Sequence, residues 1–181
     1  DTVRTVGKRL QAAGYHVEEV SPPDLHAVSE LWHGIGTTEQ AHLLGPRLQG
    51  SGDPSISTFL EYWWQLRKPR DMAGYMSAFI ERDTLLHRWL MFFEDWPIVV
   101  MPSSTEPPVP AGIDIQGLDG CRRMLDALYF QLTLPVLGLP GLAVPVGMVQ
   151  GLPMGVQLTA ARYREDLLLD QAADRVPHDD V

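Results

Sequence analysis

Three short apolar runs interrupt a chain that is otherwise patterned for helices, and they constrain the fold more than any other feature. They span residues 97–102, 141–148 and 154–159, and none of them contains a charged side chain. Proline or glycine bounds each run. Continuous apolar runs of this length are typical of strands buried on both faces of a sheet. With helices between them, they predict an α/β fold.

Apolar residues recur at helical spacing over most of the remaining chain. Gly14 is placed to end the first of these helices, and a glycine- and proline-rich stretch at residues 45–54 predicts a loop. Residues 15–20, which precede two prolines, read as a fourth strand. Four strands, some of them buried on both faces, indicate a piece of a larger sheet. The predicted helices span residues 2–13, 25–35, 39–48, 58–67, 72–93, 118–132 and 164–175.

Length and composition narrow the class of protein. The 181 residues suit one compact domain over 1–181, and an excess of Asp+Glu (23) over Lys+Arg (14) argues against nucleic-acid binding. The acidic balance fits a small-molecule or protein partner, and equally a solvated surface. No apolar run approaches the roughly 20 residues that span a bilayer, so no membrane contact is expected. A single cysteine, Cys121, excludes an internal disulfide and suits a cytoplasmic location.

The sequence offers no self-contained catalytic apparatus. It lacks a G-x-S-x-G turn, and its one serine pair, Ser103-Ser104, follows Pro102 without flanking glycines. That pair reads either as a nucleophile at a sheet edge or as a polar turn, and we favour the turn. The two lysines, Lys8 and Lys68, do not look like buried bases. We therefore predict no catalytic residue in this chain.

Metal and cofactor sites are not predicted either. The six histidines are scattered without an H-E-x-x-H pattern, and the glycines at 138, 141 and 147 do not form G-x-G-x-x-G. Asp83 falls on the apolar stripe of the helix predicted at 72–93. It reads as a site residue, or as a structural partner on a half-exposed face, and the second interpretation is the commoner outcome for such a carboxylate.

The segment L-G-L-P-G-L-A-V-P-V-G at 137–147 resembles the G-x-P-A-x-x-x-P strand of amidase-signature enzymes. It is followed by G-L-P-M-G-V-Q at 151–157, which resembles that family's G-L-P-x-G-x-Q turn and strand. Residues 162–170 are similar to its R-x-x-E-D-x-L-L helix start, and residues 95–102 and 9–20 match two further family segments. The order and spacing of these motifs make the resemblance specific.

The resemblance implies an α/β/α sandwich with a central mixed sheet, of which this chain is the C-terminal part. It also implies hydrolysis of carboxylic amides to acid and ammonia or amine by a Ser–cis-Ser–Lys triad. In the family that triad lies in the N-terminal half, and no position here matches its motifs, so the chain alone is expected to be inactive. One departure is Gly141, where many members have alanine.

The expected partners are a small-molecule amide substrate and a polypeptide that completes the fold: a missing N-terminal half, a partner chain or a second copy. Phe130, Gln131 and Leu134 precede the 141–148 strand, so we predict that they line the substrate pocket; plain packing at a helix end is the alternative. Residues 99–101 and 142–146 should be buried strands of one sheet.

A different class of function stays open at this point, a non-catalytic α/β binding or assembly protein on an amidase-like scaffold. A large exposed apolar surface would favour the incomplete enzyme, and a polar, closed surface would favour the binding protein.

Overall fold

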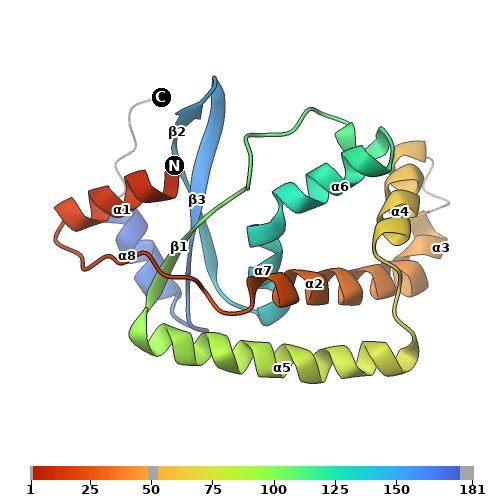
Figure 1. Cartoon of the computed structure of the whole chain (residues 1–181), viewed down its shortest axis with the longest axis horizontal. Helices are drawn as coiled ribbons and strands as arrows, with labels where there is room; N and C mark the ends of the chain where they lie inside the picture. The colour runs from red at the N-terminus through yellow and green to blue at the C-terminus, as the bar shows by residue number, and fades with distance from the viewer. Residues whose placement is uncertain (1, 49–52, 176–181) are drawn as a thin grey trace.

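The computed structural model describes residues 2–48 and 53–175. Its helices pack around a small sheet, with α1 and α8 on one side of the strands and α7 on the other (Figure 1). The elements are α1 (Thr2–Ala12), α2 (Leu25–Glu39), η1 (Gln40–Leu44), α3 (Gly45–Leu48), α4 (Pro54–Leu66), α5 (Met72–Asp95), β1 (Ile98–Pro102), η2 (Ile113–Ile115), α6 (Leu118–Ala127), α7 (Tyr129–Leu137), β2 (Gly141–Val149), β3 (Leu152–Ala160) and α8 (Glu165–Arg175).

The three strands form one sheet in the order β1-β3-β2, with both pairs antiparallel. A two-residue turn joins β2 to β3, and Gln150 and Gly151 both have positive φ there (53° and 77°). This is the geometry that matches the twist of a tight hairpin. The register slips between Pro145 and Gly147, where a proline cannot donate to the ladder. β2 and β3 therefore form a hairpin.

One face of the sheet packs against the two terminal helices. Val156 and Leu158 of β3 contact a cluster that includes Val6 and Leu10 of α1 and Leu168 of α8. All five side chains are buried. Because side chains alternate along a strand, the neighbouring residues of β3 point to the opposite face.

The opposite face carries the largest core of the protein. Val99 and Met101 of β1 pack with Trp89 and Phe93 of α5 and with Leu134 of α7. Both faces of β1 are thus covered, as its apolar run predicted, and residues 99–101 and 142–146 do lie in one sheet. In the second stretch only Val144 and Val146 are buried; they face the cluster of the terminal helices, while Ala143 and Pro145, which alternate with them, are exposed.

Several predictions about single elements are wrong. Residues 15–20 belong to no strand, although Tyr15 and Val17 pack against the buried cluster that β3 forms with α1 and α8. A strand needs a neighbour for its backbone groups, and no described strand runs beside this segment. The helix predicted at 118–132 is two helices, which break at Leu128, and the second continues through Pro135 to Leu137. Residues 45–48 form α3, so the helix predicted over 39–48 is confirmed there and the loop predicted over 45–54 is wrong for them; residues 49–52 lie outside the described residues.

The apolar stripe predicted on α5 is buried over only half its length. Leu86 and Phe93 are in the core, whereas Met72 and Met76 are 74% and 64% exposed, and Phe79 is also exposed. A helix of 24 residues is longer than the core beneath it. Asp83 is exposed, and its nearest cation is its neighbour Arg82, with 3.8 Å between Nη1 and Oδ1. No helix in the described ranges is long and apolar enough to cross a membrane.

Candidate functional site

A hollow of about 390 Å³ lies between α7 and the second face of the sheet. We call it the α7–β3 hollow. None of its lining residues carries a charge, and its polar side chains are one serine and two glutamines. The lining consists of Ser103, Gln131, Leu134, Pro135, Leu139, Gly141, Ala143 and Gln157.

The hollow forms where β3 brings a polar residue to the middle of the sheet. Gln157 lies between Met101 of β1 and Ala143 of β2 in the register, and it is only 6% exposed. Gln131 and Leu134 are three residues apart on α7, so they lie on one side of that helix. The small residues Gly141 and Ala143 keep the floor of the hollow low.

Hydrogen bonds fix the polar side chains of the hollow. Nε2 of Gln157 donates to the main-chain oxygen of Phe130 at 2.8 Å, and Nε2 of Gln131 donates to the main-chain oxygen of Ser103. The Ser103 hydroxyl in turn donates to the oxygen of Gly155 at 2.9 Å. These bonds join α7, the segment after β1 and β3, which are far apart in sequence. A buried polar side chain needs such partners, because an unpaired one costs about 1–3 kcal/mol.

Two arginines hold the C-terminal end of α7 against this site. Arg82 of α5 donates to the carbonyl of Val136, and Arg162 donates to that of Leu137 at 2.6 Å. The last carbonyls of a helix lack internal partners, and cations are favourable there. Gly138 then ends the helix with a φ of 65°, which a side chain would strain. The wall that carries Gln131 and Leu134 is therefore rigidly anchored.

Local packing explains why a glycine occupies position 141. A Cβ at this position would overlap Cδ1 of Leu134, which lies directly over it. The departure from alanine noted in the sequence thus accompanies a leucine that occupies the space above the strand.

Two of the three residues predicted for the pocket line this hollow, and the third, Phe130, does not. Gln131 and Leu134 line the hollow. The main-chain oxygen of Phe130 accepts the hydrogen bond from Gln157, while the Phe130 side chain packs against the core formed by α5, β1 and α7. Sequence reasoning missed Gln157 and Ser103 as lining residues. The signal for Gln157 was present, because a glutamine inside an otherwise apolar buried strand needs a partner.

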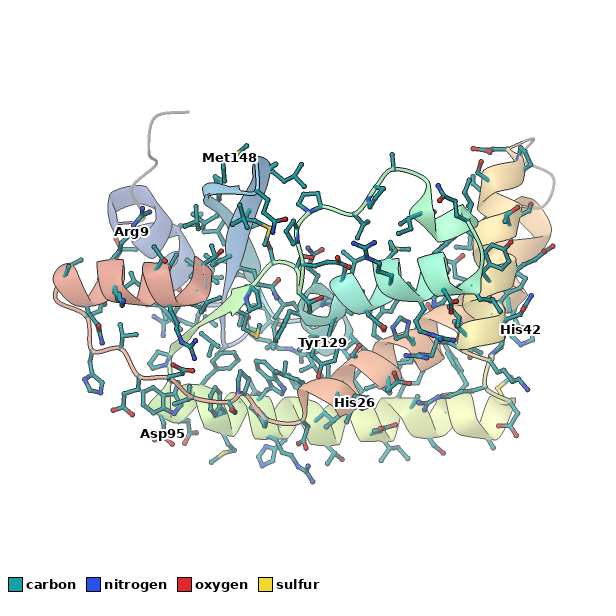
Figure 2. The ribbon with its side chains drawn as sticks, turned by 45° about the horizontal axis from the view of Figure 1, so that its top comes forward. Arg9, His26, His42, Asp95, Tyr129 and Met148 are labelled. Carbon is teal, nitrogen blue, oxygen red and sulfur yellow. The ribbon has the colours of Figure 1, made fainter. Side chains whose placement is uncertain are left out.

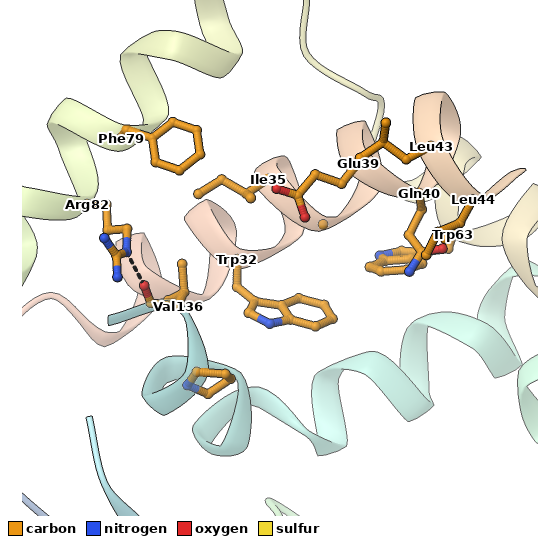
Figure 3. Close-up of a pocket in the computed structure, with 12 residues that line it drawn as sticks. Trp32, Ile35, Glu39, Gln40, Leu43, Leu44, Trp63, Phe79, Arg82 and Val136 are labelled. Atoms are coloured by element: carbon orange, nitrogen blue, oxygen red, sulfur yellow. Dashed lines mark hydrogen bonds between the residues drawn. The ribbon is translucent and has the colours of Figure 1, made fainter. Parts of the chain in front are cut away.

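A second hollow, of about 650 Å³, opens between α2, α5 and η1 (Figure 3). We call it the α2–α5 hollow. Trp32, Trp63 and Phe79 give it aromatic walls, and Figure 3 shows Arg82 at the end near Val136. The two hollows share Pro135 as a lining residue, so they lie on either side of the same turn of α7.

The strongest pKa shift belongs to His33, beside the second hollow. Burial, and secondarily the positive charge of Arg67, lowers the pKa of His33 to about 4. Its Nδ1 accepts a hydrogen bond from Nε1 of Trp63 at 3.2 Å, which fixes the neutral tautomer. Trp32 stacks on Trp63 with 5.4 Å between ring centroids. A histidine that is neutral and 3% exposed is part of the packing of α2 on α4.

The hydroxyls of the serine pair act as turn donors. Ser103 donates to Gly155, as described above, and Ser104 donates to the oxygen of Ala127 at 3.1 Å. Figure 2 shows His26 and His42 at well-separated places on the surface. Within residues 2–48 and 53–175, no three His, Cys, Asp or Glu side chains are grouped closely enough to hold a metal ion.

Comparison with known proteins adds three findings. A family model described as Amidase matches residues 1–169. An indoleacetamide hydrolase of Bradyrhizobium japonicum is 33% identical over 177 residues, which cover 94% of this chain and 37% of the relative. One subunit of the glutamyl-tRNA(Gln) amidotransferase of Streptococcus pyogenes serotype M5 (strain Manfredo) is 28% identical over 96% of this chain and 40% of its own length.

Solved structures share the fold. A 6-aminohexanoate cyclic dimer hydrolase complexed with substrate superposes with a TM-score of 0.74 at 23% identity, over 95% of this chain and 39% of that one. The chain therefore spans about two fifths of the length of each of these three proteins.

Proposed function

The chain belongs to the amidase family, and from that premise we propose that it is the C-terminal part of an enzyme that hydrolyses carboxylic amides to an acid and ammonia or an amine. The match over residues 1–169 is the observation that carries the proposal. In this proposal, residues 1–181 are part of one amidase domain.

The catalytic groups of this enzyme lie outside the chain. A serine nucleophile needs a base beside it and a strained, glycine-rich turn to present it. Ser103 and Ser104 instead donate to main-chain oxygens, and Lys8 and Lys68 are exposed. A Ser–cis-Ser–Lys triad would come from the remaining three fifths of a family-length protein.

The surface supports an incomplete fold. Met72, Met76 and Ile80 are 74%, 64% and 73% exposed on one side of α5, and Leu43 is 65% exposed on nearby η1. Clustered apolar side chains of this size on a surface mark a docking site. The sheet also ends, in its described part, on β1, which carries no charge to protect its edge. A remaining N-terminal part, a partner chain or a second copy would cover these surfaces.

The α7–β3 hollow is the substrate pocket in this proposal. Gln131 and Leu134 form its wall on α7, and Phe130 anchors Gln157. The hollow has apolar walls with a few fixed polar groups, which is the usual composition of a small-molecule site.

Intact-mass spectrometry and an amide hydrolysis assay on the protein purified from its source test the proposal. We expect a longer polypeptide, or a complex that includes this chain, to release ammonia from indole-3-acetamide, and we expect the purified 181-residue chain to be inactive. Turnover by the chain alone that disappears in Ser103→Ala would place the nucleophile here. A 20.2 kDa monomer without activity in the source cells would instead favour a non-catalytic binding or assembly protein.

A further inference from the structure

The two glutamines of the α7–β3 hollow are oriented by their partners. A main-chain carbonyl can only accept a hydrogen bond, so the nitrogen of each side-chain amide must face it. Nε2 of Gln157 faces the oxygen of Phe130, and Nε2 of Gln131 faces that of Ser103. The orientation of both side chains is thereby fixed.

The oxygens of the same side chains have no partner. Among the described residues, no hydrogen bond reaches Oε1 of Gln157 or Oε1 of Gln131, although both residues line the hollow. The third polar lining group, the hydroxyl of Ser103, uses its hydrogen on Gly155. What the hollow offers to a ligand is therefore a set of neutral acceptors, with no lining charge.

We infer that the α7–β3 hollow recognises the N–H groups of an uncharged primary carboxamide through the side-chain oxygens of Gln157 and Gln131. This inference rests on the proposed function and makes both glutamines specificity-determining residues. The apolar lining, including Leu134 and Leu139, contacts the carbon skeleton of the ligand.

The two fixed side-chain oxygens distinguish a primary amide from the corresponding carboxylic acid as ligands. A primary amide carries two N–H donors, which match the two oxygens. A carboxylate has only acceptor oxygens, so it would meet Gln157 and Gln131 without a donor and would lose its water in an uncharged hollow. The pocket thus favours the substrate of hydrolysis over its acid product, which helps the product to leave.

Three small probes with one carbon skeleton test the inference: phenylacetamide, phenylacetate and N,N-dimethylphenylacetamide. The last keeps the amide carbonyl and has no N–H. We expect ¹⁵N-labelled chain to bind phenylacetamide at least tenfold more tightly than either of the others in an NMR titration. A net factor of about five for each neutral hydrogen bond gives this size. The side-chain amide signals of Gln157 and Gln131 should shift during the titration.

Substitutions separate the two oxygens. Gln131→Met, on the more exposed side of the hollow, should weaken phenylacetamide binding about fivefold and leave phenylacetate unchanged. Gln157→Met should do the same, provided that its chemical shifts show a folded chain. Gln65→Met, at an exposed glutamine on α4, is the matched control and should change neither affinity.

Equal binding of the three probes would overturn the inference, as would the absence of any binding or an undiminished affinity in Gln131→Met. The proposed function fails separately. A protein that hydrolyses amides without this preference contradicts only the inference, whereas a chain with the preference, whose complete protein hydrolyses no amide, contradicts only the proposed activity.

Discussion

The two halves of α5 have the same kind of sequence and opposite surroundings. In the C-terminal half, Leu86, Trp89 and Phe93 are buried against β1 and α7. In the N-terminal half, Met72 and Met76 project from the surface. One helix thus serves as core at one end and as an uncovered face at the other. The difference shows that an apolar stripe on a helix does not by itself tell which of its residues the chain buries.

The largest expected effect lies in the buried half. Trp89→Ala should lower the free energy of unfolding by about 3–5 kcal/mol, because a fully buried indole leaves a cavity that the neighbours cannot fill. Met76→Ala, in the exposed half, should change it by less than about 0.5 kcal/mol. Urea denaturation of both variants measures the difference. Similar losses in the two variants would contradict the contrast between the halves.

The next effect concerns the packing of α2 on α4, beside the exposed half of α5. It is measured as the change in stability when His33 becomes protonated. In the folded chain the pKa of His33 is about 4, whereas in the unfolded chain it is near its ordinary value of about 6.5. Between these values only the unfolded state gains the proton, so stability is complete above pH 6.5 and falls as the pH drops towards 4. The loss attributable to this group is about 3 kcal/mol.

Denaturation curves at about pH 7, above both pKa values, and at about pH 4, near the folded-state value, measure this loss. His33→Asn should show a smaller decrease in stability between the two conditions than the unsubstituted chain. His87→Asn, at an exposed position of α5, should retain the full decrease. An unchanged decrease in His33→Asn would show that other groups cause it.

A smaller effect is expected where the exposed half is attached to α2. The hydroxyl of Tyr75 donates to Oε1 of Glu39 at 2.7 Å, and this bond also raises the pKa of Tyr75. Tyr75→Phe should cost about 1 kcal/mol in unfolding free energy. Tyr62→Phe is the control, because the Tyr62 hydroxyl has no hydrogen-bond partner among the described residues. Equal costs in the two variants would exclude a contribution from the contact with Glu39.

Features that depend on local chemistry could be predicted from the sequence. β2 and β3 lie where the apolar runs at 141–148 and 154–159 predicted strands, and α1 ends before Gly14, as expected. Two of the amidase-like segments, at 137–147 and 151–157, lie largely on β2 and β3. Gln131 and Leu134 line the α7–β3 hollow, and their role in binding a substrate stays a prediction.

Features that depend on distant contacts could not be predicted. Residues 15–20 have strand composition but no neighbour to pair with in the described chain. Gln157 lines the hollow only because the fold brings Phe130, 27 positions earlier, within hydrogen-bond distance. The exposure of Met72 and Met76 depends on what covers α5, which helical periodicity does not report.

The smallest effect on stability, and the most direct test of the uncovered face, is expected from a combined substitution, Met72→Ser, Met76→Ser and Ile80→Ser. All three side chains are largely exposed, so the unfolding free energy should change by less than about 0.5 kcal/mol per site. Exposed apolar patches promote association, so light scattering should show less self-association than in the unsubstituted chain. The matched control, Glu81→Ser and Thr84→Ser, replaces polar residues that are also exposed on α5 and should leave association unchanged. If the unsubstituted chain is already a monomer at high concentration, the exposed half of α5 is an ordinary surface, and the contrast between its halves reflects only the length of the helix.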